Sequence, residues 1–238
     1  MDGVARGAGR GVGRGVERGP GTITFIIGGA HSGKSSFAER RAGESCARVI
    51  RAGGGGVAGD AQKRVVYVAT GGAGDAEMTA RIAAHRRKRL PGWQTVEEQW
   101  QVGDVIRGSG GAGAVVVVDC LTLLVSNLVL RAVGPGAEES MPEQVADEAA
   151  SRAQAAVEGE VAALLDAARA AREAGGDVIV VSNEVGQGLV PPYPLGRLFR
   201  DLLGWANQAL AAAADEVYLL VAGIPLCLRG DGAQGGGA

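Results

Sequence analysis

The chain has few cysteines and few histidines, and this scarcity limits the kinds of site it can hold. Its 238 residues include 3 cysteines and 2 histidines. Cys46, Cys120 and Cys227 lie far apart and form no C-x-x-C pair, which argues against a zinc site and against a disulfide framework. We therefore expect reduced thiols and a cytoplasmic location.

Long hydrophobic runs are also missing, and charge of neither sign dominates. No apolar run approaches the roughly 20 residues that a membrane-spanning helix requires, and the N-terminus lacks the apolar core of a signal peptide. A net charge of -2 gives no global attraction to nucleic acid or to an anionic membrane. We expect a soluble protein with no membrane span and no nucleic-acid partner.

The hydrophobic content of 46% is enough for one core, so we expect a single domain over residues 22–229. Glycine and arginine alternate in residues 1–21, and residues 230–238 are similarly poor in apolar side chains, so we expect both ends to be disordered. An RNA-contacting arm is the alternative for residues 1–21. That stretch has no aromatic residue for base stacking, however, and it carries Asp2 and Glu17.

Short β-branched runs alternate with longer alanine-rich stretches, a pattern typical of a parallel sheet with crossover helices. The predicted strands are 22–27, 65–69, 114–119, 178–182 and 217–221, with 225–228 as an edge hairpin partner. The predicted helices are 34–47, 75–90, 121–131, 138–174 and 195–214. In such sheets, ligands bind at the carboxyl ends of the strands.

The stretch from Gly28 to Ser35 reads GGAHSGKS and fits the phosphate-binding pattern G-x-x-x-x-G-K-[ST], directly after the first predicted strand. Its glycines let backbone N–H groups surround an anion, and the next helix directs its positive end toward that anion. Lys34 adds a mobile charge, and Ser35 offers a hydroxyl to Mg²⁺. A glycine-rich turn with a chance lysine is the alternative. We expect an α/β fold that is P-loop NTPase-like, with a mostly parallel, RecA-like sheet flanked by helices.

Asp119 is a second candidate, because it ends an apolar run of four valines. An acid in this place is typical of the magnesium side of nucleoside-triphosphate enzymes. The alternative is an ordinary aspartate that caps the helix starting at Leu121. Since the phosphate loop is present, we favour the magnesium role and expect Asp119 to lie beside the loop.

His85 lies on the predicted helix 75–90, within a local basic cluster. The cluster consists of Arg81, Arg86, Arg87, Lys88 and Arg89. A neutral imidazole beside a triphosphate is a competent nucleophile, which forms a phosphoramidate that a second substrate then attacks. Two alternatives remain: His85 shares a helical face with Met78 and Ile82 and could pack at a core edge, and the basic run could be a solvated helix end.

The run SNEVGQG, from Ser182 to Gly188, follows another predicted buried strand. It places an amide, a carboxylate and flexible glycines where a nucleotide or an acceptor would lie, with a bare turn as the alternative. Further polar residues follow on one predicted helix, and they are either binding groups or an exposed face. They are Arg197, Arg200, Asp201, Asn207 and Gln208.

Together these segments resemble the bifunctional adenosylcobinamide kinase and adenosylcobinamide-phosphate guanylyltransferase family of cobalamin biosynthesis, over about residues 22–228. The sequence segments that carry the resemblance are GGAHSGKS, YVAT, EMTARIAAHRRKRLPGWQTVEE, VVVVDCLTLLVSNL, SNEVGQGLVP and LFRDLLGWANQALAAAADEVYLLVAGIPL. A phosphate loop alone is shared by many families. The combination of R-I-x-x-H on a helix, a tryptophan eight residues after that histidine and the NEVG word is specific.

The resemblance implies two magnesium-dependent reactions. GTP or ATP would first phosphorylate adenosylcobinamide; His85 would then attack the α-phosphate of GTP, release pyrophosphate and hold GMP for transfer to the phosphorylated corrinoid. The resemblance implies catalytic roles for His85 and Lys34 and magnesium binding by Ser35 and Asp119. The nucleotide-binding residues that it implies are Gly28, Gly29, Ala30, His31, Ser32, Gly33, Lys34, Ser35, Thr70, Gly71, Arg86, Arg87, Lys88, Arg89, Glu97 and Asp119.

The chain departs from the family pattern at His31, where arginine is common, so a permanent charge is replaced by one that titrates near neutrality. Residues 191–194 and Ala209 also depart from it. The family forms homotrimers, and we expect a homo-oligomer here. A plain phosphate-loop kinase of another small molecule, in which His85 only packs or positions, is the competing enzyme hypothesis. A nucleotide-dependent RNA-binding or regulatory protein is the competing hypothesis from another class.

Overall fold

The computed structural model of the chain describes residues 20–51, 65–71, 92–134 and 143–230. Its strands are β1 (Ile23–Gly28), β2 (Val65–Ala69), β3 (Gln94–Glu97), β4 (Val115–Asp119), β5 (Asp177–Asn183), β6 (Glu216–Val221) and β7 (Ile224–Arg229). Its helices are α1 (Lys34–Arg51), α4 (Val102–Ser109), α5 (Leu121–Val133), α6 (Glu143–Glu173) and α7 (Pro194–Ala213). None of these described helices combines the length and the apolar character that crossing a membrane would need.

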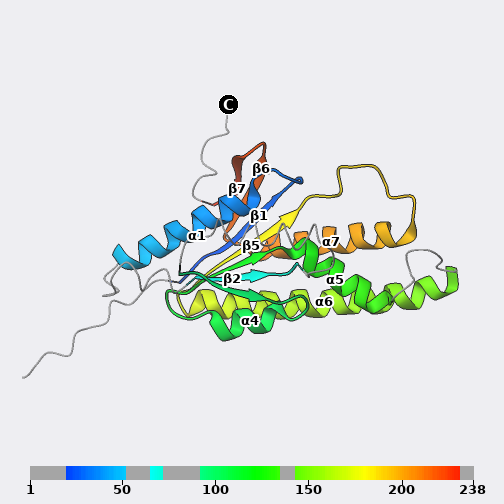
Figure 1. Cartoon of the computed structure of the whole chain (residues 1–238), viewed down its shortest axis with the longest axis horizontal. Helices are drawn as coiled ribbons and strands as arrows, with labels where there is room; N and C mark the ends of the chain where they lie inside the picture. The colour runs from blue at the N-terminus through cyan, green and yellow to red at the C-terminus, as the bar shows by residue number, and fades with distance from the viewer. Residues whose placement is uncertain (1–19, 52–64, 72–91, 135–142, 231–238) are drawn as a thin grey trace, which may run out of the picture.

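The described strands form one sheet in the order β3-β2-β4-β5-β1-β6-β7. All neighbouring pairs are parallel except β6 and β7, which are antiparallel. Helix α1 covers one face of the sheet, and α4, α5, α6 and α7 cover the other (Figure 1). The predicted α/β class, with a mostly parallel sheet between helices, is confirmed.

Each central strand sends alternate side chains into two separate cores. Along β4, Val116 and Val118 pack with α4 to α7, whereas Val115 and Val117 pack with α1. All four side chains are fully buried. A strand covered on both faces needs no polar side, which is why these strands appear in the sequence as continuous apolar runs.

Two elements escaped the sequence patterns, namely β3 and α4. β3 is only four residues long and has partly exposed, mostly polar side chains, so neither an apolar run nor a clear alternation marks it. α4 contains two glycines, yet Val102 and Ile106 are fully buried one turn apart. A Cβ at Gly103 would lie 2.8 Å from the backbone of Ala163 in α6. Close contact with α6 therefore selects glycine at this position, at the expense of local helix propensity.

The other predicted elements within the described residues are confirmed, with shifts at their ends. The predicted helix 138–174 is observed as the continuous helix α6. The predicted helix 75–90 lies outside the described residues. So do the end segments 1–21 and 230–238, except for residues 20, 21 and 230.

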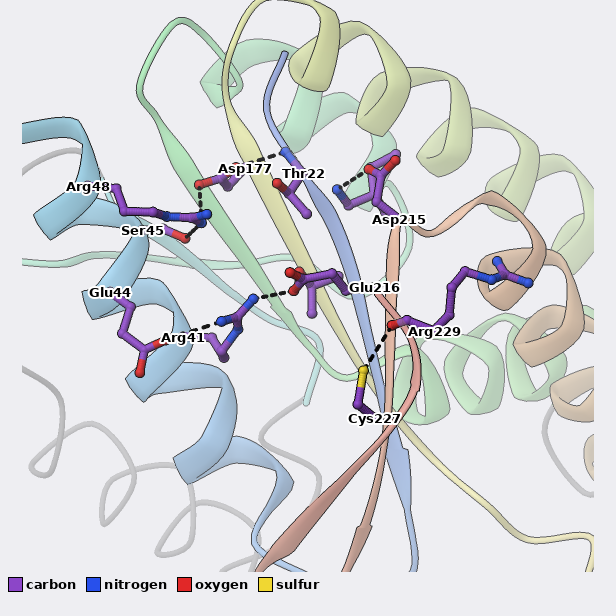
Figure 2. Close-up of polar contacts among 12 residues, drawn as sticks. Thr22, Arg41, Glu44, Ser45, Arg48, Asp177, Asp215, Glu216, Cys227 and Arg229 are labelled. Atoms are coloured by element: carbon purple, nitrogen blue, oxygen red, sulfur yellow. Dashed lines mark hydrogen bonds and ion pairs between the residues drawn. The ribbon is translucent and has the colours of Figure 1, made fainter. Parts of the chain in front are cut away.

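Ion pairs fasten α1 to the amino-terminal edge of the sheet (Figure 2). Arg41 of α1 pairs with Glu216 at the start of β6, and the Arg48 Nη2 atom lies 3.5 Å from Oδ2 of Asp177 at the start of β5. Asp177 and Asp215 also accept hydrogen bonds of 2.8 and 2.9 Å from backbone N–H groups where β1 begins. The carboxylates at the amino-terminal ends of the strands hold α1 and the sheet together. The predicted ligand residues follow the opposite, carboxyl-terminal ends of the strands.

Candidate nucleotide-binding site

The carboxyl ends of five parallel strands lie along one edge of the sheet and bring the predicted site residues together. The register pairs Glu97 of β3 with Ala69 of β2, and Ala69 with Asp119 of β4. It also pairs Asn183 of β5 with Gly28 of β1. Because β5 lies between β1 and β4, Asp119 is two strand spacings, or roughly 10 Å, across the sheet from the start of the phosphate loop.

The loop between β1 and α1 has the tight backbone that its sequence predicts. His31 and Gly33 have φ angles of 53° and 91°, in the left-handed region. The Ser32 N–H group donates a hydrogen bond to the Gly29 carbonyl at 3.3 Å. A Cβ at Gly28 would lie 2.5 Å from a backbone oxygen of β6, so only glycine fits at the base of the loop. The loop is therefore a compact backbone cradle that opens at the N-terminus of α1, where an anion is stabilised.

Lys34 lies folded against this loop. Its Nζ atom donates a 2.6 Å hydrogen bond to the Gly29 carbonyl, and a longer one of 3.5 Å to Oγ of Ser32. The residue is only 8% exposed. Burial lowers the pKa of Lys34, while the neighbouring Cys120 and Asp119 oppose that shift. A bound phosphate would give this ammonium a charged acceptor in place of a neutral carbonyl, and such hydrogen bonds are roughly twice as strong.

Asp119 is a residue at this edge of the sheet that could hold a magnesium ion. It follows Val117 on the face of β4 that α1 covers, and the Tyr67 hydroxyl donates a hydrogen bond to its Oδ2 atom. The N-cap residue of α5 is Cys120, so the alternative of Asp119 as the cap does not hold. Mg²⁺ is usually bound by one or two carboxylates together with phosphate and water oxygens, a set that Asp119 and the Ser35 hydroxyl can complete. In the described ranges, no cluster of three or more His, Cys, Asp and Glu residues forms a metal site by itself.

Thr70 fastens the end of β2 to the end of β4. Its Oγ1 donates to the Cys120 carbonyl and accepts from the Cys120 N–H group, both at 2.7 Å, and its own N–H donates to the Asp119 carbonyl at 3.2 Å. Asn127 donates to the carbonyls of Thr70 and Gln99 at 2.8 and 3.3 Å. The Thr70 hydroxyl, predicted to border a nucleotide, thus holds the backbone that carries Asp119; Gly71 follows it, partly buried.

Cys120 follows Asp119 at the end of β4, and the pKa of its thiol is high. Burial, reinforced by the charge of Asp119, raises the pKa of its thiol to about 11. The thiol is therefore protonated at neutral pH, and only a thiolate is a strong nucleophile.

A buried polar network holds the end of β5. Ser182 Oγ donates to Oδ1 of Asn207 at 2.6 Å, and Asn207 Nδ2 donates to the Asn183 carbonyl at 3.1 Å. The Asn183 N–H group donates to Oγ1 of Thr122 at 2.7 Å. Asn207 is only 7% exposed, so it is neither on an exposed face nor open to a ligand. The sequence did contain an indication of this burial, because Asn207 shares a helical face with the apolar residues Leu203, Ala206 and Leu210 of α7.

Replacing Asn207 with alanine is expected to lower the free energy of unfolding by about 2 kcal/mol, because the buried Ser182 hydroxyl and the partly buried Asn183 carbonyl each lose a hydrogen-bond partner. Urea unfolding followed by circular dichroism measures this loss. Gln208→Ala is the matched control, since Gln208 is the exposed neighbour on the same helix. Equal stability of the two variants would contradict the structural role of the network.

The segment after Asn183 forms an ordered turn beside the phosphate loop. The Glu184 N–H group donates to the Gly28 carbonyl at 3.1 Å, and the Glu184 carboxylate accepts from the Gly186 N–H group at 2.6 Å. Arg197 donates to the carbonyls of residues 191 and 192 at 3.1 and 2.8 Å. The Glu184 side chain thus holds a turn next to the phosphate loop, and a binding role for this segment stays a prediction.

The remaining predicted site residues divide into two groups. Glu97 ends β3 at the same edge as Asp119 and is exposed, and Ala30 and His31 are exposed at the tip of the phosphate loop. His85, Arg86, Arg87, Lys88 and Arg89 lie outside the described residues. Tyr67 and Asn127 had no predicted role, because only the folded sheet and α5 bring them to Asp119 and Thr70.

Comparisons with known proteins identify a family that matches most of the chain. Residues 24–228 match the model of the family described as cobinamide kinase / cobinamide phosphate guanyltransferase. Among solved structures, the P4 protein from bacteriophage phi6 in complex with ADP is 15% identical, with a TM-score of 0.41 over 89% of this chain and 59% of that one. The flagellar accessory protein FlaH from Methanocaldococcus jannaschii is 13% identical, with a TM-score of 0.41 over 92% and 82% of the two chains.

Three curated relatives span most of both sequences. The chain is 38% identical to the bifunctional adenosylcobalamin biosynthesis protein CobP of Pseudomonas aeruginosa, covering 87% of this chain and 96% of that protein. It is 35% and 37% identical to the proteins named CobU of Escherichia coli and Salmonella typhimurium, covering 87% of this chain and 99% of each. The chain belongs to the cobinamide kinase / cobinamide phosphate guanyltransferase family, a family of transferases.

Proposed function

We propose that this protein phosphorylates adenosylcobinamide with GTP or ATP and then transfers GMP from GTP to the phosphorylated product. The observation that carries the proposal is the phosphate loop with its buried lysine, at the same sheet edge as Asp119. Membership of the family supports both reactions. The nucleotide is therefore a substrate of both steps.

In the kinase step, the loop from Gly28 to Gly33 would surround the phosphates with backbone N–H groups, and Lys34 would leave the Gly29 carbonyl to contact them. Ser35 and Asp119 would hold Mg²⁺, which neutralises charge on the phosphates when it is bound. The acceptor is the free hydroxyl group of the aminopropanol arm of adenosylcobinamide. Its oxygen attacks the γ-phosphorus, the bond to the β-phosphate oxygen breaks, and the hydroxyl proton is released.

In the guanylyl step, a neutral nitrogen of His85 would attack the α-phosphorus of GTP. A nitrogen–phosphorus bond forms, the bond to the β-phosphate oxygen breaks, and pyrophosphate leaves. A phosphate oxygen of the corrinoid phosphate then attacks the same phosphorus and releases the histidine, giving adenosylcobinamide-GDP. Arg86, Arg87, Lys88 and Arg89 would balance the phosphate charge, and the Glu97 carboxylate would accept hydrogen bonds from ribose hydroxyls.

The proposal is tested by following the products made from adenosylcobinamide, Mg²⁺ and nucleotide by liquid chromatography and mass spectrometry. With GTP we expect adenosylcobinamide phosphate first and adenosylcobinamide-GDP later, whereas ATP alone supports only the first product. Product that stops at the phosphate in the presence of GTP would identify a plain kinase. Failure to form either product would overturn the proposal.

A further inference from the structure

Tyr67 is a buried tyrosine whose hydroxyl contacts the carboxylate of the proposed magnesium site. It lies in the middle of β2, opposite Val117 of β4, and is 1% exposed. Its side chain lies on the α1 face of the sheet, as do those of Val117 and Asp119, and its hydroxyl donates a hydrogen bond to Oδ2 of Asp119. The phenol therefore spans from the core to the functional edge.

The hydroxyl, rather than the ring, needs an explanation here. The ring packs in the core beneath α1, with its centroid 6.5 Å from that of Trp93. A phenylalanine would fill the same space and would bring no polar group into the core. Burying a hydroxyl is unfavourable unless it is hydrogen-bonded, and this hydroxyl donates to the Asp119 carboxylate.

The Tyr67 hydroxyl donates its hydrogen bond to the Oδ2 atom of the Asp119 carboxylate and not to its Oδ1 atom. In the described part of the chain, hydrogen bonds to the Asp119 side chain reach only Oδ2, while its backbone carbonyl is held by the Thr70 N–H group. An aspartate held at one oxygen and at its backbone has little freedom to rotate. Partners that fix a ligating carboxylate in this way typically change metal affinity about 10- to 100-fold.

We propose that Tyr67 is a positioning residue for magnesium: its hydroxyl holds Oδ2 of Asp119, so that Oδ1 is presented to the Mg²⁺ ion of the bound nucleotide. The inference rests on the proposed role of Asp119 in magnesium binding. In this role Tyr67 would contact neither the metal nor the nucleotide. The residue falls in the word YVAT, which carries the family resemblance without a role for its tyrosine.

Tyr67→Phe removes the hydroxyl and keeps the ring, so it separates metal positioning from packing. We expect its affinity for a non-hydrolysable GTP analogue, measured by calorimetry in excess EDTA, to equal that of the unaltered protein. We expect the Mg²⁺ concentration needed for half of the metal-dependent gain in affinity to rise about 10-fold. Electron paramagnetic resonance with Mn²⁺ and the same analogue should show the same loss of bound metal.

Two control variants make the outcomes distinct. Tyr218→Phe removes a hydroxyl from another tyrosine on the α1 face, whose ring packs on Phe37, and should leave metal dependence unchanged. Asp119→Asn should raise the Mg²⁺ requirement at least as much as Tyr67→Phe. If Asp119→Asn shifts it and Tyr67→Phe does not, the role of Tyr67 is overturned and the proposed function stands. If Asp119→Asn shifts nothing, the magnesium role of Asp119 fails and the inference about Tyr67 falls with it.

A general disturbance of the fold would give a different pattern. It would weaken binding of the analogue in EDTA as well as in Mg²⁺ and would lower the midpoint of thermal unfolding. Such a result would count against a positioning role, because that role predicts a defect confined to the metal. Activity of the complete enzyme is not needed for either measurement.

Discussion

A His85→Asn variant is expected to keep the kinase reaction and to lose guanylyl transfer by at least about 10⁴-fold, as for other enzymes that lose a covalent nucleophile. Asparagine is polar and similar in size, but its amide nitrogen has no available lone pair for attack on phosphorus. Incubation with Mg²⁺ and GTP labelled in the α-phosphate should leave an acid-labile, base-stable label on the unaltered protein. The variant should carry no label and should accumulate adenosylcobinamide phosphate.

The chain offers a matched control for this experiment, because His31 is its only other histidine. His31 is exposed at the tip of the phosphate loop with a φ angle of 53°. His31→Arg introduces the residue that is common in the family, and it should retain the covalent label. A label that persists in His85→Asn and disappears in His31→Arg would move the nucleophile to the phosphate loop. An unaltered protein that takes up no label would remove the guanylyl-histidine mechanism altogether.

Lys34→Met is expected to lower kcat/KM for phosphorylation of adenosylcobinamide by roughly 10²–10³-fold, the usual cost of losing one preorganised donor to transition-state charge. Methionine keeps most of the length of the side chain and removes its charge. Lys34 is buried at the phosphate loop, where its ammonium donates to the Gly29 carbonyl, so its loss removes the cation that we propose contacts the phosphates. Steady-state kinetics at saturating Mg²⁺ measure the effect.

Folding should not account for the loss in Lys34→Met. Burial disfavours the charged form of this lysine, so replacing it with an apolar side chain should leave the free energy of unfolding unchanged or raise it. Arg40→Met is the matched control: Arg40 is an exposed cation on the same helix, with its guanidinium 5.5 Å from the Phe37 ring centroid. Arg40→Met should keep full activity. A loss below about 10-fold in Lys34→Met would contradict direct contact between Lys34 and the transferred phosphate.

The sequence was sufficient where local pattern and tertiary environment agree. Strands buried on both faces appear as continuous apolar runs, so β1, β2, β4 and β5 were predicted with small errors at their ends. The glycines and the lysine of the phosphate loop were identified because their spacing reflects local backbone geometry. β3 and α4 were missed because neighbours stabilise them: β3 pairs with β2, and Gly103 of α4 packs against α6.

The roles of single polar residues were predicted less well. Asn207 was assigned to binding or to an exposed face, but it is buried and bonded to Ser182 and Asn183. That Thr70 borders the nucleotide stays a prediction, but no pattern in the sequence indicated that its hydroxyl holds the Cys120 backbone. The role of a polar side chain depends on its hydrogen-bond partners in the folded chain. Here Ser182 is 25 residues from Asn207, and Cys120 is 50 residues from Thr70.

The sequence by itself determined the α/β class, the phosphate loop and the family, because each follows from residue types at fixed local spacing. The tertiary structure decided how the ends of the strands combine. It placed β5 between the loop and Asp119, joined β2 to β4 through Thr70, and brought the Tyr67 hydroxyl to the Asp119 carboxylate. These arrangements depend on strand order and register, which follow from packing of the whole sheet and leave no short-range signal in the chain.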